Sequence, residues 1–336
     1  MTQQSSVNSV LSETDRLVHH AVPLFLARLS NPRLRSLAQR ALQQKKQFDR
    51  AVLVRIGCEA SGGDWRLLKP VFVAVEAMDS SIVLVDDIMD ESQYRAGGPP
   101  LFRQFGVGKV LAVAFAMSHL ANEVLMEFAE ENVHSKVRSI QIVSGYLHAL
   151  RRTWEGQYRD VELQTDGHPK SAVRSYFQMI QETTGFQVGA YLRLGAELCS
   201  APLNLATSLY EFGVALGVLL QIRDDYLDYL GSPKILGKAN MSDYAVGKLR
   251  LPFILAVKYA DSKTRRWIRV RLGQGPVSEV ERPSILRAIA NPNAVGSLKR
   301  LLKSRIEQAR RILCELPSPN GPKTMLEELL YLAGGL

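Results

Sequence analysis

Apolar residues recur at three- and four-residue spacing along most of the chain, and residues 120–156 show this pattern over their whole length. Apolar positions with this spacing fall on one face of an α-helix. No proline occurs between Pro100 and Pro169, which allows several long helices in that region. Few segments show the two-residue alternation that is typical of half-buried strands. The pattern therefore predicts an all-α protein.

Helix-breaking residues fall in short clusters, at 61–64, 96–100, 165–169, 231–234 and 291–293, and these mark loops between helices. No internal repeat, low-complexity linker or shift in composition divides the 336 residues. We therefore predict one domain over residues 1–336, in which 1–30 form a less ordered N-terminal extension. Residues 31–50 are predicted to form a basic amphipathic helix with its charges in solvent.

Composition narrows the range of partners. The hydrophobic share of 46% is enough for a substantial core, and the formal net charge of +9 favours anionic partners. Lys and Arg are scattered rather than clustered, which favours a small anionic substrate over nucleic acid. No apolar stretch reaches 18 residues without a charged or polar break, so no membrane span is expected. The N-terminus is polar and contains acids, which is unlike a signal peptide.

The three cysteines, Cys58, Cys199 and Cys314, lie far apart and show no CxxC spacing. This spacing indicates neither a disulfide framework nor a zinc site. It fits a reducing compartment and a cytoplasmic location.

Two clusters of aspartate follow apolar runs with the same i, i+1, i+4 spacing: Asp86, Asp87 and Asp90, and then Asp224, Asp225 and Asp228. On a helix each cluster presents two stacked carboxylates and one about 100° around the axis. Like charges one turn apart weaken a helix, and carboxylates beside apolar surface are costly to desolvate. Carboxylate oxygens and substrate phosphates together suit Mg²⁺. Two facing acidic helices with Mg²⁺ between them would neutralise a diphosphate.

Several motifs occur in one order around these clusters. They are "DDIMD" followed by Arg95, "EGQYRD" with Gln157 and Asp160, "LQIRDDYLDYLG", Gly237–Lys238, and "GKLRLP" at 247–252. From about Leu42 to Pro252 the chain resembles the trans-prenyltransferases, the farnesyl and geranylgeranyl diphosphate synthase family. The resemblance implies a helical bundle of the isoprenoid synthase type around a deep central cavity, usually dimeric. It also implies about three Mg²⁺ ions, held by the six aspartates, and ionisation of an allylic prenyl diphosphate.

The same resemblance assigns further residues. Arg95, Lys238 and Lys248 would face the diphosphate, and Gln157, Asp160, Thr184 and Gln221 would line the active site. Each of these last four residues could instead be a hydrogen-bonded polar group of the core. The small Ser81 stands at the position of the cavity floor, which implies room for a C15 to C20 chain.

In this sequence, the site for the family's second substrate, isopentenyl diphosphate, lacks most of the basic residues that the family has there. Gln47, Phe48 and Ala51 stand where the family has lysine, arginine and proline, and only Arg50 of that motif is retained. Asp79 replaces a histidine, Ala96 an arginine, and Thr183 the lysine that contacts the allylic diphosphate. A carboxylate would repel a diphosphate where a cation should attract it.

Four functions fit these features. The first is a class I terpene synthase that acts without isopentenyl diphosphate, its cation attacked by its own double bonds or by water. The second is prenyl transfer to a neutral acceptor such as an indole or phenol, and the third is a chain-elongating synthase that uses isopentenyl diphosphate. The fourth is a non-catalytic partner subunit, against which the six aspartates argue.

Overall fold

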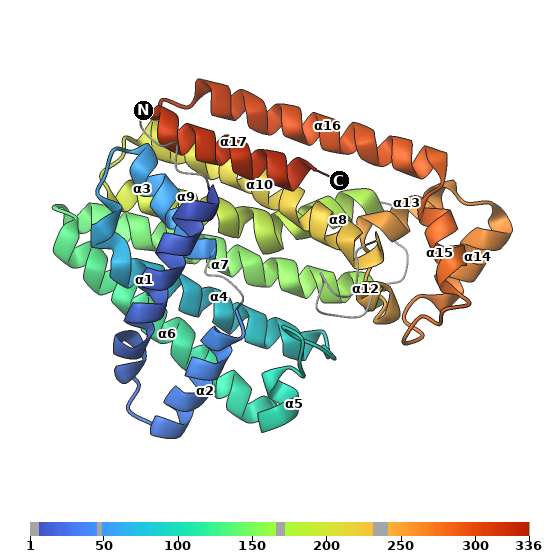
Figure 1. Ribbon diagram of the computed structural model, residues 1–336, viewed down its shortest axis with the longest axis horizontal. Coiled ribbons are helices and arrows are strands. Elements are labelled where there is room, and N and C mark those ends of the chain that lie inside the picture. The colour runs from blue at the N-terminus through green and yellow to red at the C-terminus, as the bar shows by residue number, and fades with distance from the viewer. Residues whose placement is uncertain (1–6, 46–48, 166–171, 231–240, 336) are drawn as a thin grey trace.

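The computed structural model describes residues 7–45, 49–165, 172–230 and 241–335 as a bundle of helices (Figure 1). No strand occurs within these ranges, so the all-α fold class is confirmed. The helices are α1 (Val7–Ala27), α2 (Pro32–Gln43), α3 (Asp49–Ala60), η1 (Trp65–Leu68), α4 (Lys69–Met89), α5 (Leu101–Phe105), α6 (Val107–Asn132), α7 (Lys136–Thr165), α8 (Ala172–Ile180), η2 (Gln181–Gly185), α9 (Phe186–Leu198), α10 (Leu203–Leu230), α12 (Ser242–Ala245), α13 (Leu251–Tyr259), α14 (Ser262–Arg271), α15 (Arg282–Ile289), α16 (Pro292–Glu315) and α17 (Asn320–Gly334).

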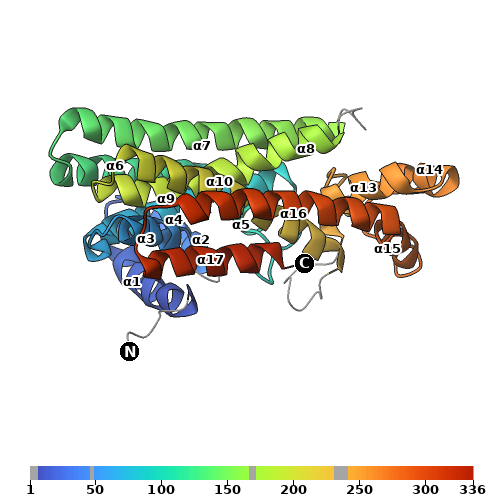
Figure 2. The ribbon, with the colours of Figure 1, turned by 90° about the horizontal axis from the view of Figure 1, so that it is seen from above.

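The long helices lie roughly side by side, in layers. Figure 2 shows α7 along one edge of the molecule and α16 and α17 on the other side of α10. The pair α9 and α10, the pair α4 and α6, and the pair α3 and α9 make the most extensive contacts. One cluster of buried apolar side chains extends from Val7 to Ala333. The single domain over residues 1–336 stays a prediction.

Glycines allow α9 to approach its neighbours closely. A Cβ at Gly195 would lie 1.8 Å from the Val54 carbonyl oxygen of α3, and one at Gly213 of α10 would lie 2.6 Å from the Cα of Gly189. Any side chain at these positions would force the helices apart. The close packing places the ends of α4 and α10, which carry the two aspartate clusters, toward the same end of the bundle (Figure 1).

The N-terminal segment differs from the expectation of a less ordered extension over residues 1–30. Helix α1 occupies Val7–Ala27 and buries Val10, Val18 and Leu26. The reason is that these apolar residues recur every three or four positions among polar ones, which gives the helix one face that packs on the core. The basic helix expected over 31–50 is divided, because α2 ends at Gln43 and α3 begins at Asp49.

The prediction that the cysteines form no disulfide is wrong for one pair. Cys58 of α3 and Cys199, just after α9, are joined by a disulfide with their Cα atoms 5.5 Å apart. The two residues are 141 positions apart, and only the packing of α3 on α9 brings them together. Cys314 is free and exposed. The argument for a reducing compartment, which rested on isolated cysteines, is thereby removed.

Two helices are long and apolar enough to cross a membrane by length and composition alone. They are α6 and α10, with mean hydropathies of 1.3 and 1.5 over their best 18 residues. The apolar window of α10 is 56% buried inside the bundle and that of α6 is 39% buried. Both pack against core helices, which explains their apolar composition without a membrane.

Candidate active site

The first aspartate cluster lies at the C-terminal end of α4. Asp87 is buried and accepts a bidentate pair of hydrogen bonds from Arg95, at 2.9 Å from Nε and 2.5 Å from a terminal nitrogen. Asp86 lies 3.9 Å from the same guanidinium, and Asp90 pairs with the Lys248 ammonium. Arg95 and Lys248, which the sequence predicts to face a diphosphate, form ion pairs with the aspartates of this cluster. Their contact with a diphosphate stays a prediction.

Crowding of the carboxylates in the first cluster changes the pKa of Asp86. Burial, and then the neighbouring Asp90 carboxylate, raise the pKa of Asp86 to about 7, although Lys248 and Arg95 oppose this. The Asp86 side chain nevertheless keeps 25% of its surface accessible, so an external ligand can reach it. A cation bound there would hold the carboxylate in its ionised form.

The second cluster lies at the C-terminal end of α10. Asp225 is buried and accepts hydrogen bonds from the Tyr176 hydroxyl at 2.6 Å and from Gln221 Nε2 at 2.8 Å. Gln221 Oε1 in turn accepts from the Thr184 hydroxyl at 2.8 Å. Thr184 and Gln221 therefore do lie beside the second cluster, in a chain of hydrogen bonds that ends on Asp225.

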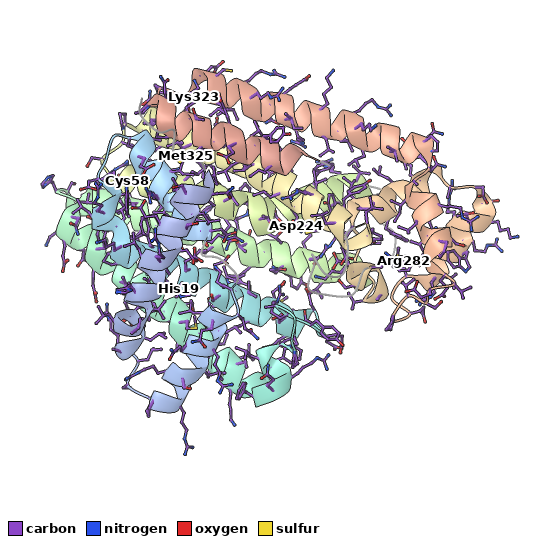
Figure 3. All side chains as sticks on the ribbon, in the orientation of Figure 1. His19, Cys58, Asp224, Arg282, Lys323 and Met325 are labelled. Atoms are coloured by element: carbon purple, nitrogen blue, oxygen red, sulfur yellow. A yellow bond between two sulfur atoms is a disulfide. The ribbon has the colours of Figure 1, made fainter. Side chains whose placement is uncertain are left out.

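The other two aspartates of α10 differ from Asp225 in their surroundings. Asp228 is buried and accepts from the Ser242 hydroxyl at 2.7 Å and the Asp243 backbone N–H at 3.1 Å, which ties α10 to α12. Asp224 is exposed, and Figure 3 shows it near the middle of the molecule. Asp224 thus has the accessibility that an external ligand requires, whereas Asp228 also holds the following helix in place.

Buried ion pairs connect the two clusters. Lys248 contacts Asp90 of the first cluster and lies 3.3 Å from Asp160 of α7. Arg250 makes a bidentate pair with Asp160, at 2.6 and 3.0 Å, and its Nε lies 3.8 Å from Asp225 of the second cluster. Despite burial, Arg250 and Lys248 hold the pKa of Asp160 well below its usual range. Asp160 is therefore the ionised centre of a network between the two clusters.

An irregular turn positions Thr184. The segment η2 is a π-helical turn between α8 and α9, and it packs on α7 at Gly156. A Cβ at Gly156 would lie 2.7 Å from the Cβ of Glu182 and 2.8 Å from the Thr183 backbone nitrogen. Glu182 is buried and pairs with Arg152 and Arg159 of α7, both at 2.9 Å. These contacts fix η2 against α7, with Thr184 directed toward Gln221.

For the remaining predicted residues, the described part of the chain shows no hydrogen bond or ion pair with the aspartate clusters. Lys238 lies outside the described residues, and Gln157 is half-buried on α7 one turn before Asp160. Ser81 is buried, and its hydroxyl donates to the Met78 carbonyl of its own helix at 2.7 Å. A hollow of about 180 Å³ between α7 and α9 is lined by Tyr146, Ala190 and Leu194 among others, and by none of the aspartates. The deep central cavity therefore stays a prediction.

Sequence analysis missed three residues of this site, Tyr176, Asp243 and Arg250. Arg250 was part of the quoted motif "GKLRLP" but received no role, and its position two residues after Lys248 was the available signal. Asp243 pairs with Arg250 at 3.1 Å. Tyr176 and Asp243 lie in no motif, and only the packing of α8 and α12 on the end of α10 reveals them.

The donor set fits a hard cation, because both helix ends present carboxylate oxygens. Within the described residues, however, no three His, Cys, Asp or Glu side chains already converge on one metal position. Arg95, Lys248 and Arg250 instead neutralise Asp87, Asp90 and Asp160. Asp86 and Asp224 are the accessible carboxylates at the two helix ends that could hold Mg²⁺, and Asp90 could join them where Mg²⁺ displaces Lys248.

A separate cluster of charged side chains, distinct from the two aspartate clusters, lies nearer the start of α4, where the sequence departs from the family. Asp79 accepts from Lys45 Nζ at 2.8 Å and from Arg50 Nε at 2.9 Å. Glu76 pairs with Lys45, and its other oxygen accepts the Ala51 backbone N–H at 2.7 Å. We call Lys45, Arg50, Glu76 and Asp79 the α4 cluster. Its two cations are matched by two carboxylates, so the retained Arg50 is paired inside the protein.

The pKa values of the two carboxyl groups of the α4 cluster are shifted in opposite directions. Burial raises the pKa of Glu76 to about 7, although Lys45 opposes the shift. Burial acts in the same direction on Asp79, but Arg50 and Lys45 outweigh it and hold the pKa of Asp79 well below its usual range. Asp79 is thus the permanent anion of this cluster.

Comparison with known proteins gives one consistent result. The polyprenyl synthetase family model matches residues 31–289. A (2E,6E)-farnesyl diphosphate synthase of Mycobacterium tuberculosis is 28% identical over 291 residues, covering 84% of this chain and 77% of that protein. A geranylgeranyl diphosphate synthase of the same organism is 30% identical over 268 residues, covering 78% and 73%.

Solved structures agree on the fold. The geranylgeranyl pyrophosphate synthetase of Pyrococcus horikoshii superimposes with a TM-score of 0.85 at 21% identity, covering 98% of this chain and 99% of that one. The polyprenyl synthase of Caulobacter crescentus, solved with calcium and isoprenyl diphosphate, gives 0.84 at 22% identity and covers 100% and 99%. With the motifs and the fold in agreement, the chain belongs to the polyprenyl synthetase family.

Proposed function

We propose that this protein binds an allylic prenyl diphosphate between the ends of α4 and α10 and ionises it, and that it does so without isopentenyl diphosphate. The observation that carries the first part is the buried network Asp90–Lys248–Asp160–Arg250–Asp225, which connects the two aspartate clusters. The family's relatives are named as prenyl diphosphate synthases, which supports the same substrate class.

The residues would divide the work as follows. Asp86, Asp90 and Asp224 would hold Mg²⁺, which when bound supplies Lewis-acid stabilisation of the diphosphate leaving group. Arg95 and Lys248 would compete with Mg²⁺ for the carboxylates of the first cluster. The cations released from these pairs would then stabilise the negative charge that develops as the carbon–oxygen bond breaks. Tyr176 and Gln221 hold Asp225 in one orientation through two hydrogen bonds. The fixed geometry reduces the reorganisation that ionisation would otherwise need.

The second part of the proposal rests on the α4 cluster. A second diphosphate would need free cations on this face, but Lys45 and Arg50 are paired with Glu76 and Asp79. Asp79 lies seven residues before Asp86, which places both on the same face of α4 at a rise of about 10 Å. The position that would face an acceptor diphosphate is therefore occupied by an ionised carboxylate.

The main alternative is chain elongation with isopentenyl diphosphate, which the names of the relatives favour. Transfer to a neutral indole or phenol stays open, because a neutral acceptor does not need a free cation and the cations of the α4 cluster are paired. A non-catalytic partner subunit is disfavoured by the buried network at the two clusters, which such a subunit would not need.

One pair of incubations separates these functions. Purified protein with Mg²⁺ and farnesyl or geranylgeranyl diphosphate is incubated with and without isopentenyl diphosphate, and all products are identified by mass. We expect a hydrocarbon or alcohol, with release of diphosphate, in both incubations. A longer prenyl diphosphate that forms only with isopentenyl diphosphate would show elongation and refute the proposal. Product that forms only after addition of indole or a phenol would show transfer to a neutral acceptor.

The accepted chain length is proposed to be C15 to C20, because Ser81 adds little volume on α4. Ser81→Phe should shift the preference toward a C10 substrate, measured as kcat/KM for C10, C15 and C20 diphosphates. The control is Ser80→Phe, whose side chain lies about 100° away around the helix. An unchanged order of preference in Ser81→Phe would contradict the assignment of the cavity floor.

We further propose a homodimer, formed along α7. Exposed apolar side chains follow one face of this helix at spacings of three, four and seven residues: Val137, Ile140, Leu147, Trp154 and Tyr158. This spacing is typical of a helix that packs on another helix. Figure 2 shows no element outside α7 on that edge of the molecule. A second copy of the same face would cover the apolar stripe. A cytoplasmic location stays a prediction.

A further inference from the structure

Helix α14 is the most basic element of the structure. Half of its ten residues are Lys or Arg, none is acidic, and Asp261 caps its start. Lys263, Arg266 and Arg269 make no ion pair with any described residue. Arg271 is the exception, because it pairs with Glu281 at 2.6 Å. The outer face of α14 therefore carries cations that nothing within the described chain neutralises.

The same face carries apolar side chains. Ile268 is buried and fixes which side of α14 faces the protein. With 100° per residue, Val270 and Arg266 then point outward, with Lys263 and Trp267 toward one flank of the helix and Arg269 toward the other. Val270 is 70% exposed and Trp267 is 37% exposed. A rigid helix with a cationic outer face and an exposed Trp and Val has the composition of helices that lie in a membrane interface.

A shallow hollow of about 480 Å³, largely open to solvent, runs along one side of this helix. Its lining consists of Ser262, Arg265, Arg266, Arg269 and Val270. Three guanidiniums and a hydroxyl in one hollow suit a phosphate group, because Arg presents several N–H donors in a planar fork. The hollow thus combines phosphate donors with an apolar wall at Val270.

The position of α14 allows contact with an extended surface. Figures 1 and 2 both show α14 and α15 at one end of the long axis, beyond α13. Figure 3 shows Asp224 near the middle of the molecule and Arg282, the first residue of α15, close to the end that carries α14. A surface bound by α14 would therefore lie against this end of the long axis.

We propose that α14 docks this protein on an anionic phospholipid bilayer, with lipid phosphates in the arginine-lined hollow and Trp267 and Val270 in the interface. Charge complementarity determines the choice of an anionic surface. The exposed Val and Trp favour a bilayer over nucleic acid, whose backbone would offer them no apolar contact. The proposal does not depend on which acceptor the enzyme uses.

The test is cosedimentation of the full-length protein with vesicles of phosphatidylcholine alone, or with about one lipid in three replaced by phosphatidylglycerol. We expect binding to the anionic vesicles only, and weaker binding at high salt. Arg266→Glu/Arg269→Glu should weaken it by about 25-fold or more, because each surface cation contributes about a fivefold factor. Val270→Ser should weaken binding less and leave its salt dependence intact.

The matched control is Arg33→Glu/Lys109→Glu, which changes the charge equally at exposed positions of α2 and α6. This variant should bind anionic vesicles nearly as well as the wild type. Both double variants should keep the circular dichroism spectrum and the turnover of prenyl diphosphate in solution. Equal loss in both variants would show attraction by net charge alone and overturn the proposal. Equal binding to both vesicle types, or binding to a short RNA duplex but not to vesicles, would overturn it as well.

Discussion

Arg250 illustrates how much a single side chain determines in this protein. Its guanidinium is buried and contacts Asp160, Asp225 and Asp243, which come from three different elements. Removal of one partner from a buried ion pair typically costs about 3–5 kcal/mol, because the other charges remain buried and unpaired. At the residue scale, the site is therefore organised by buried cations as much as by the aspartates.

The first prediction concerns Asp86. Asp86→Asn should lower turnover of a prenyl diphosphate by about three orders of magnitude, because it removes a negatively charged ligand where the leaving group is stabilised. Diphosphate release measures the rate, and circular dichroism should stay helical. Glu130→Gln, an exposed carboxylate on α6, is the matched control. Near-normal turnover of Asp86→Asn would refute the metal assignment.

The second prediction concerns Glu76, whose pKa is raised to about 7 from its usual 4.5. Between these values the native state holds a proton that the unfolded state has released, so rising pH destabilises the fold. Relative to Glu76→Gln, the wild type should therefore lose up to a few kcal/mol of unfolding free energy from about pH 4.5 to 7. Above pH 7 the difference should stay constant.

The charged residues that face Glu76 do not obscure the change expected between about pH 4.5 and 7. They are Lys45, Asp79 and Asp49. Asp79 titrates below this range, because its pKa is lowered, and Lys45 titrates above it. Asp49 is exposed at the start of α3, and its charge helps to raise the pKa of Glu76, so it is left unchanged. The control variant is Glu130→Gln, at an exposed position of α6, which should keep the wild-type pH dependence. A difference between wild type and Glu76→Gln that is flat across this pH range would contradict the raised pKa.

At the scale of elements, the spacing of apolar residues predicted the helices well and the irregular turns between them poorly. The apolar spacing over 120–156 corresponds to α6 and α7 in the structure. The π-helical turn η2 gave no signal in the sequence, because its geometry depends on Gly156 and Glu182 from two separate segments. The first turn of α14, by contrast, is capped locally by Asp261, which accepts from the Thr264 backbone N–H at 2.9 Å.

The third prediction belongs to α7. Ile140→Glu/Leu147→Glu places two charges on its exposed stripe and should convert a dimer to a monomer, measured by light scattering. Burying a charge without a partner in an interface is the cause. The control is Leu24→Glu/Tyr331→Glu, because both residues are exposed on other helices. A monomeric wild type, or a dimer that survives the α7 substitutions, would exclude this interface.

At the scale of the whole molecule, the Cys58–Cys199 disulfide joins two helices that are distant in sequence. Such a cross-link restricts the unfolded chain and typically adds about 2–4 kcal/mol of stability. Cys58 is fully buried, so reduction requires at least local opening.

The fourth prediction follows from this bond. Purified, oxidised protein should show one reactive thiol in denaturant, that of Cys314, and three after reduction. Cys58→Ser/Cys199→Ser should melt at a lower temperature than the wild type, whereas Cys314→Ser should melt near the wild-type temperature. Three thiols in the unreduced protein would show that the bond does not form in solution.

The sequence by itself determined the all-α fold, the two aspartate clusters at helix ends, and the family. These features depend on spacings of one to four residues, which fix the face of a helix before any tertiary contact forms. Only the tertiary structure decided which cations meet which carboxylates. Lys248 and Asp90 are 158 residues apart, and Arg250 and Asp160 are 90 apart, and nothing local in the chain relates them. The same holds for the Cys58–Cys199 bond and for Glu76 beside Lys45. Such contacts depend on how whole helices pack, and the glycines that let α9 approach α3 and α10 are what bring much of this packing about.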